Sequence, residues 1–119
     1  MALEDNTLQV INRSPSNPVR IYIAGPVAEI ERALARHAAH VGMCVTVEPL
    51  RFVFSGGRED GARIGLINYP RFPASPEELE EKAMSLARML ITDLGQGSAS
   101  VETPEQTIFV SRRPEDLRA

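Results

Sequence analysis

The 119-residue chain is short of several features that would place it in a specialised class of protein. Its only cysteine is Cys44, which excludes an internal disulfide, and no group of Cys and His residues has the spacing of metal ligands. No apolar run approaches the length of a membrane span, and the stretch MALEDNTLQV lacks the basic and apolar regions of a secretory signal. The sequence therefore predicts a cytoplasmic protein with no metal, no cofactor and no membrane partner.

What is present is the composition of an ordinary globular domain. Apolar residues make up 43% of the chain and charged residues 24%, with a net charge of -3, which is typical of one folded domain rather than a disordered chain. Of the 13 basic residues only Lys82 is lysine, so arginine, which binds phosphate or carboxylate through a planar fork, supplies the rest. We expect the domain to span residues 18–113. It would be flanked by a flexible lead over residues 1–17 and a tail over residues 114–119. A short extra strand over residues 7–12 of the lead is an open alternative.

The first half of the domain predicts a strand that leads into a helix. Residues 19–25 (VRIYIAG) alternate apolar and polar side chains, which is the period of a half-buried strand. Apolar residues then recur at helical spacing over 27–41 until Gly42 offers a stop. The next strand-like segment should follow directly after this glycine.

Two strand-like segments in the middle of the chain predict a hairpin. Residues 44–55 are rich in β-branched and aromatic side chains, and Pro49 among them suggests an edge position or a bulge. The stretch GGREDG (56–61) is typical of a turn, and residues 62–69 are again strand-like. The turn would therefore separate two antiparallel strands.

A second helix and a final strand complete the pattern. Ser75, Pro76 and Glu78 form an N-cap, a first-turn proline and a capping-box glutamate, so a helix should begin there. The last strand is expected around 107–112, with 98–102 as its partner in a terminal hairpin. The order β-α-β-β-α-β is that of an α+β, ferredoxin-like two-layer sandwich, with both helices on one face of an antiparallel sheet.

The other face of this sheet is predicted to lie open. Strand alternation places five side chains on it: Arg20, Tyr22, Arg63, Ile67 and Tyr69. Arg51 and Val53 would join them if Pro49 causes a bulge in their strand. Phe109 and Arg113 would join them in one of the two possible registers of the last strand. Such a mixture of arginine and aromatic residues indicates contact with another molecule, and Arg20, Tyr22 and Ile67 are the predicted interface of a homodimer or higher oligomer. The alternative is a wet sheet covered by arginine stems and tyrosine rings.

The stretch NYPRFP, residues 68–73, is the predicted ligand site. Pro70 and Pro73 restrict the backbone around Tyr69 and Phe72, so little entropy remains to be lost on binding. Arg71 and Phe72, with Tyr69 and Arg63 nearby, would bind an anionic, nucleotide-like molecule by gripping phosphate and stacking a base. The alternative is that Phe72 plugs the core under the second helix. Other sites for the anion would be Arg58 in the hairpin loop, or Arg112 and Arg113.

No catalytic signature is visible in the sequence. His37 and Cys44 are interpreted as core residues, because one lies in the apolar stripe of a helix and the other begins an apolar strand. No catalytic residue is predicted, since a nucleophile with its base, a metal site and an acid-base pair are all missing. The hypothesis is therefore a non-catalytic, homo-oligomeric protein that binds an anionic small molecule. The alternative is a structural or regulatory module whose open sheet serves self-association or a protein partner.

Two resemblances bear on the partner. The stretch IYIAGP (21–26) resembles the short first-strand motif of RNA-recognition-motif domains, in which Tyr22 would stack a base. Residues 60–69, DGARIGLINY, lack the alternating aromatics of that family's longer motif, so the sequence argues against RNA. The run from Gly42 to Pro73 resembles small proteins encoded by phages and prophages. That resemblance implies action in the host cytoplasm, with roles such as sequestering a nucleotide defence signal.

Overall fold

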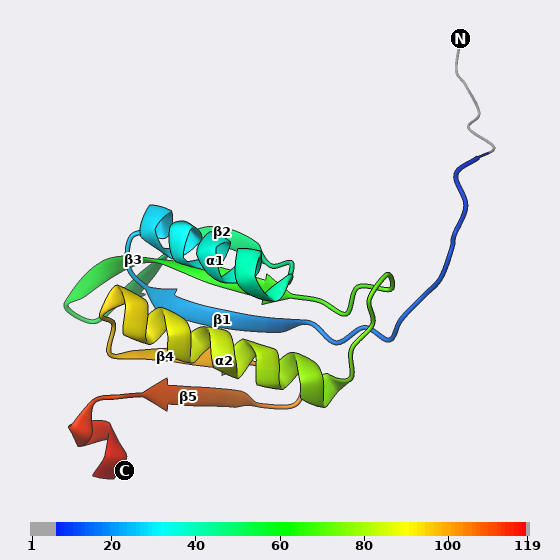
Figure 1. Cartoon of the computed structure of the whole chain (residues 1–119). Helices are drawn as coiled ribbons and strands as arrows, with labels where there is room; N and C mark the ends of the chain where they lie inside the picture. The colour runs from blue at the N-terminus through cyan, green and yellow to red at the C-terminus, as the bar shows by residue number, and fades with distance from the viewer. Residues whose placement is uncertain (1–6, 119) are drawn as a thin grey trace.

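The computed structural model describes residues 7–118, which form a sheet layer and a helix layer (Figure 1). The elements are β1 (Val19–Ala24), α1 (Val27–Val41), β2 (Thr46–Phe54), β3 (Gly57–Leu66), α2 (Pro76–Leu94), β4 (Ser98–Glu102), β5 (Thr107–Ser111) and the 3-10 helix η1 (Pro114–Arg118). The sheet has the order β2-β3-β1-β4-β5 with all neighbours antiparallel. The predicted α+β, ferredoxin-like class is confirmed, with β5 added beside β4.

Helix boundaries follow from local chemistry. Ser75 Oγ accepts a hydrogen bond from the Glu78 backbone N–H at 3.1 Å, and the Glu78 carboxylate accepts one from the Ser75 N–H at 3.0 Å. This capping box, followed by Pro76, begins α2 as predicted. Helix α1 ends at Gly42, whose φ of 63° is in the left-handed region that closes helices. Within residues 7–118, no helix has the length and apolar content needed to cross a membrane.

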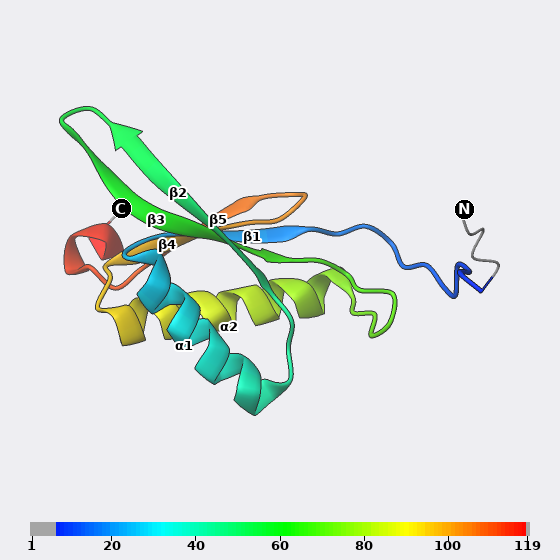
Figure 2. The same cartoon turned by 90° about the horizontal axis from the view of Figure 1, so that it is seen from above.

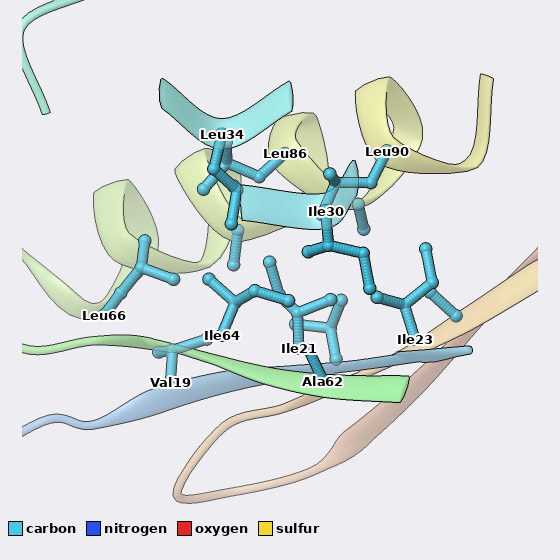
Figure 3. Close-up of a cluster of buried hydrophobic side chains, with 14 of the residues drawn as sticks. Val19, Ile21, Ile23, Ile30, Leu34, Ala62, Ile64, Leu66, Leu86 and Leu90 are labelled. Carbon is cyan, nitrogen blue, oxygen red and sulfur yellow. The ribbon is translucent and has the colours of Figure 1, made fainter. Parts of the chain in front are cut away.

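The core lies between the helices and one face of the sheet, as Figure 3 shows. Alternate residues of the two central strands point toward the helices, because side chains of a strand alternate between its faces. They meet the apolar stripes of α1 and α2. The labelled members of this cluster are Val19, Ile21, Ile23, Ile30, Leu34, Ala62, Ile64, Leu66, Leu86 and Leu90. One face of the sheet is thus used for packing, and any site must lie on the other face or at the ends.

The β2-β3 hairpin differs from its prediction. The two strands pair without interruption from Thr46 opposite Gly65 to Phe54 opposite Gly57, and the turn is only Ser55 and Gly56. The expected turn over 56–61 is therefore wrong. Of the two alternatives for Pro49, the edge position is confirmed, because β2 is the edge strand of the sheet, and the bulge is wrong. Gly56 alone supplies the positive φ, 95°, which lets such a short turn reverse the chain. The β2-β3 hairpin consequently extends beyond the helices (Figure 2).

The described part of the lead is attached by side-chain hydrogen bonds to the segment that joins β3 to α2. Residues 7–12 form no strand, but Asn12 Nδ2 donates to the Pro70 carbonyl at 2.8 Å and Ser14 Oγ donates to the Asn68 carbonyl at 2.5 Å. The buried Asn68 amide donates to the Pro15 carbonyl at 3.0 Å and accepts from the Ala74 N–H at 2.8 Å. The lead thus rests on the segment that joins β3 to α2. Flexibility of residues 1–17 stays a prediction, and residues 1–6 lie outside the described part.

Candidate functional site

The open face of the sheet carries a mixed aromatic and polar surface. Strand pairing places each residue on it, because paired residues in an antiparallel ladder point to the same side. Since Ile21, Ile64 and Val101 face the helices, their neighbours along each strand face away. The residues on the open face include Arg20, Tyr22, Glu48, Phe52, Phe54, Glu59, Gly61, Arg63, Ser98, Ser100, Glu102 and Phe109.

A shallow hollow of about 270 Å³ lies on this face. It is lined by Tyr22, Ala24, Phe52, Phe54, Glu59, Ser98, Ala99 and Ser100. Its volume is slightly below the roughly 300 Å³ at which enclosed small-molecule sites usually begin. Aromatic rings on one side and hydroxyl groups on the other give it an apolar wall and a polar wall.

Glycine on β3 makes room for one of these rings. A Cβ atom at Gly61 would stand 2.5 Å from Phe52 Cε2 and 2.5 Å from the Ile23 carbonyl oxygen. Both distances are far inside van der Waals contact, and the carbonyl belongs to the backbone and cannot swing aside. Gly61 is therefore required for the ring of Phe52 to lie against the sheet, where it forms the floor of the hollow.

The charged groups around the hollow are mostly paired. An Arg63 Nη2–H donates to Glu48 Oε2 at 2.8 Å, and this bond, with a further one to Tyr22, raises the pKa of the Arg63 guanidinium. Glu102 Oε1 accepts from the Tyr22 hydroxyl at 3.2 Å and from Arg20 at 3.5 Å.

Glu59 is different from these paired groups. It lies opposite Phe52 in the ladder and lines the hollow. No hydrogen bond or ion pair joins it to another residue of the described chain. It therefore offers an unneutralised carboxylate next to aromatic rings, which is an arrangement suited to a cation.

The C-terminal segment fixes one hydroxyl of the hollow. Ser98 Oγ accepts a hydrogen bond from Arg113 Nη2 at 2.9 Å, so its own hydrogen is available to a ligand. Arg113 Nε in turn donates to the Asp116 carboxylate at 2.9 Å. Hydrogen bonds from Ser111 and then Arg113 lower the pKa of Asp116. The segment around η1 therefore holds Arg113 against the edge of the site.

The predicted site residues do not come together in one place. The structure puts Arg20, Tyr22 and Arg63 on the open face, whereas Ile67 and Tyr69 leave it. Strand β3 ends at Leu66, and the Tyr69 N–H donates to the Ile67 carbonyl at 3.1 Å, a tight turn that breaks the strand alternation. Arg63 bonds to Glu48 within the sheet, whereas Tyr69 contacts Cys44 and Phe72, so the structure does not bring Arg63 and Tyr69 into contact.

The remaining expected members of the face divide as follows. Arg51 and Val53 lie on the opposite face because β2 does not bulge, and Arg58 pairs with Val53 inside β3 instead of lying in a loop. Phe109 does lie on the open face, opposite Ser100. Arg112 follows β5, and its N–H donates to the Gly97 carbonyl at 3.0 Å. Ligand and interface roles for all of these arginines stay predictions.

Tyr69 and Phe72 meet at the end of the sheet, in a place here called the ledge, residues 67–74. Their ring centroids are 5.6 Å apart at an angle of 49°. Cys44 Sγ lies 3.6 Å from the Tyr69 hydroxyl, and this contact, with burial, raises the pKa of that phenol. Cys44 is exposed, which corrects its interpretation as a core residue, and Arg71 is exposed as well. Neither plugging of the core by Phe72, which is 58% exposed, nor a cluster of arginines is found here.

Sequence reasoning missed Phe52, Phe54, Glu59, Ser98 and Ser100. The signal for the rings was present, because Leu50, Phe52 and Phe54 alternate once the bulge is given up. Glycines at 57, 61 and 65 recur on the same side of β3, along the part that pairs with β2. Gly57 lies opposite Phe54, and Gly61 leaves room for the neighbouring Phe52 ring, so these glycines let the two rings lie against the sheet. The prediction of a turn over 56–61 excluded this arrangement.

Comparison with known proteins adds a likeness of fold. No family model and no curated protein matches the sequence. A solved structure of a phage SAM lyase in the apo state is similar, with a TM-score of 0.73 and 16% identity over 88% of this chain and 98% of that chain. A phage SAM lyase in complex with S-methyl-5'-thioadenosine is also similar, with a TM-score of 0.62 and 16% identity over 87% and 96%. Phage neighbours agree with the resemblance of the sequence to phage proteins.

These likenesses correct the hypothesis of a non-catalytic binding protein. Both solved structures are of enzymes, and both are covered almost from end to end by this chain. The hypothesis depended on the absence of a nucleophile, a metal site and an acid-base pair. That argument is unsound for reactions in which the substrate carries its own leaving group and its own nucleophile.

Proposed function

We propose that the chain is an enzyme that cleaves SAM, S-adenosylmethionine, and that the hollow on the open face is its substrate site. The observation that carries this proposal is the likeness of fold to a phage SAM lyase in complex with S-methyl-5'-thioadenosine. That molecule is what remains of SAM when its aminobutyrate group is removed from sulfur. The predicted small-molecule partner is kept, but the ligand's reactive centre is a cation rather than an anion.

The proposed reaction needs little from the protein. The bond between the sulfonium sulfur and the γ-carbon of the aminobutyrate group breaks, and its electron pair stays on sulfur, which becomes a neutral thioether. The substrate's own carboxylate forms the new bond to the γ-carbon and closes a five-membered lactone. No water enters and no proton is transferred, since the ammonium group keeps its charge. A protein that holds SAM in the bent conformation can perform this step by orientation alone.

The residues of the hollow fit the parts of SAM. The rings of Phe52 and Phe54 offer faces for the adenine, and the Ser98 hydroxyl is available as a donor. Glu59 supplies a carboxylate for the sulfonium or the ammonium group. Its role is binding rather than rate acceleration, because the positive charge on sulfur disappears as the bond breaks, so a carboxylate there favours the ground state.

The hollow is too shallow to enclose a whole substrate, and we propose that a second copy of the chain closes it. Arg20 and Tyr22 lie on the same face and are retained as interface residues, whereas Ile67 lies beyond the last residue of β3. A homo-oligomer in the host cytoplasm, where SAM is available, stays a prediction. Exclusion of water by the second copy would also favour lactone formation over hydrolysis.

The test is incubation of the purified protein with SAM and separation of the products by chromatography with mass detection. S-methyl-5'-thioadenosine and homoserine lactone should appear in equal amounts. Heavy-oxygen water should leave the freshly formed lactone unlabelled. Loss of SAM without the thioether product, or no turnover at all, would refute the proposal and leave the sheet for self-association or a protein partner.

A further inference from the structure

The described N-terminal arm, residues 7–11, carries three apolar side chains that are mostly exposed to solvent. Leu8, Val10 and Ile11 are 78%, 69% and 84% exposed. Figures 1 and 2 both show this segment running away from the sheet and helix layers. Single exposed apolar residues are ordinary, but three within four positions of an extended segment indicate a surface that is covered by a partner.

The arm leaves the body next to the ledge. Its root is held by the bond from Asn12 Nδ2 to the Pro70 carbonyl at 2.8 Å and by the bond from Ser14 to Asn68. Pro70 belongs to the ledge. The direction in which the arm departs is therefore fixed by the same segment that carries Tyr69 and Phe72.

The ledge itself has an unfilled hollow. It measures about 140 Å³, and Cys44, Ile67, Tyr69 and Phe72 are among the residues that line it. A cavity of about 150 Å³ lined by apolar side chains holds a benzene molecule, so this hollow can accept one aliphatic side chain. Ile67, 49% exposed, and Phe72 stand at its rim with apolar surface toward solvent.

We propose that the arm of one copy inserts an aliphatic side chain, Val10 or its neighbour Leu8, into the ledge hollow of a second copy. The arm's own root is tied to Pro70 and the chain runs outward from there, so the hollow of the same copy lies behind it. Reciprocal exchange between two copies covers both arms and both hollows with one two-fold contact. Prolines 70 and 73 hold the ledge in shape before binding, which reduces the entropy lost on docking. This contact is separate from the open face and does not depend on the proposed reaction.

The chain provides its own reporter, because its only cysteine, Cys44, lines the hollow. We expect the rate at which a thiol reagent modifies Cys44 to fall as protein concentration rises, by severalfold between dilute and concentrated samples. In Val10→Asp this dependence should vanish. The matched control is Val53→Asp, which changes a valine of similar exposure on the β2-β3 hairpin, and which should keep the dependence. Melting temperatures verify that both variants are folded.

A second experiment identifies the occupant. A chain with Cys44→Ser and Val10→Cys is mixed with wild-type chain and treated with a short bis-maleimide. A peptide that joins position 10 to Cys44 can then form only between two copies, and it is the expected product. Absence of that peptide, or protection of Cys44 that Val10→Asp removes equally at every concentration, would overturn the proposal. The second result would mean that each arm folds back onto its own ledge.

Discussion

Replacement of Glu59 by glutamine removes one charge from the proposed substrate hollow and changes little else. The Glu59 carboxylate has no partner in the described chain, so its loss leaves no buried group unsatisfied. Two unit charges 4 Å apart interact by about 1 kcal/mol in water and by about 4 kcal/mol at an effective dielectric constant of 20. Glu59 is exposed in the isolated chain, so the lower end of this range applies. We expect KM for SAM to rise roughly fivefold to tenfold, since about 1.4 kcal/mol corresponds to a factor of ten.

We do not expect kcat to fall when KM rises. The sulfonium charge is lost in the transition state, so a carboxylate that stabilises the ground state does not lower the barrier. Steady-state assays that follow S-methyl-5'-thioadenosine should therefore give a kcat that is unchanged or higher in Glu59→Gln. Glu31→Gln, which alters an exposed glutamate of α1 on the other side of the sheet, is the control and should change neither constant.

A large fall in kcat with no change in KM would refute this reasoning. It would mean that Glu59 acts on a group that gains positive charge in the transition state, or that it removes a proton. If Glu59 removes a proton from the β-carbon while the bond to sulfur breaks, the product would be an alkene formed by elimination rather than a lactone. Analysis of the four-carbon product in the same samples distinguishes these two reactions.

Three further predictions concern stability. Gly61→Ala should lower the unfolding free energy by about 1–3 kcal/mol, because the new methyl group overlaps the Phe52 ring and the Ile23 carbonyl, and denaturant titration should show it. Cys44→Ser should change stability by less than about 0.5 kcal/mol, since the thiol is exposed, and a larger loss on thermal melting would place Cys44 in a core. The lowered pKa of Asp116 means that its contribution to stability is present above the ordinary value of 3.8 and is lost as pH falls through the lowered pKa of the folded chain. Melting curves of wild type and Asp116→Asn should differ near pH 6 and converge at the acid end; a constant difference would show that the carboxylate's charge is not involved.

The sequence was sufficient for the fold where local chemistry acts alone. The capping box at Ser75 and Glu78, and the glycine after α1, each specify a helix end without help from distant residues. The hairpin was predicted with the wrong turn, because Arg58, Glu59 and Asp60 have turn-like composition but pair with β2 through backbone groups that any residue possesses. Pairing with β2 makes these residues part of a strand, and their composition alone does not predict it.

The candidate site was harder to predict for the same reason. Its residues come from four strands, and only the register brings Phe52, Glu59 and Ser98 to one hollow. Where alternation was followed through an unbroken strand, as at Tyr22 and Arg63, the face was right. Where it was extended past the end of β3 to Ile67 and Tyr69, a tight turn invalidated it. The proposed reaction could not be predicted from the sequence, because a reaction in which the substrate supplies both nucleophile and leaving group requires no catalytic motif.

The buried Asn68 amide has a consequence for the order in which the chain acquires its structure. It bonds to Ala74, only 6 residues away, and to Pro15, which is 53 residues away. Closing a long loop costs more entropy than closing a short one, so the joint between β3 and α2 can form early and the lead must wait for it. Residues 12–15 have no strand or helix of their own to enter beforehand. Residues 12–15 are synthesised before residues 68–74 and are therefore without their partner until that later segment has emerged and folded.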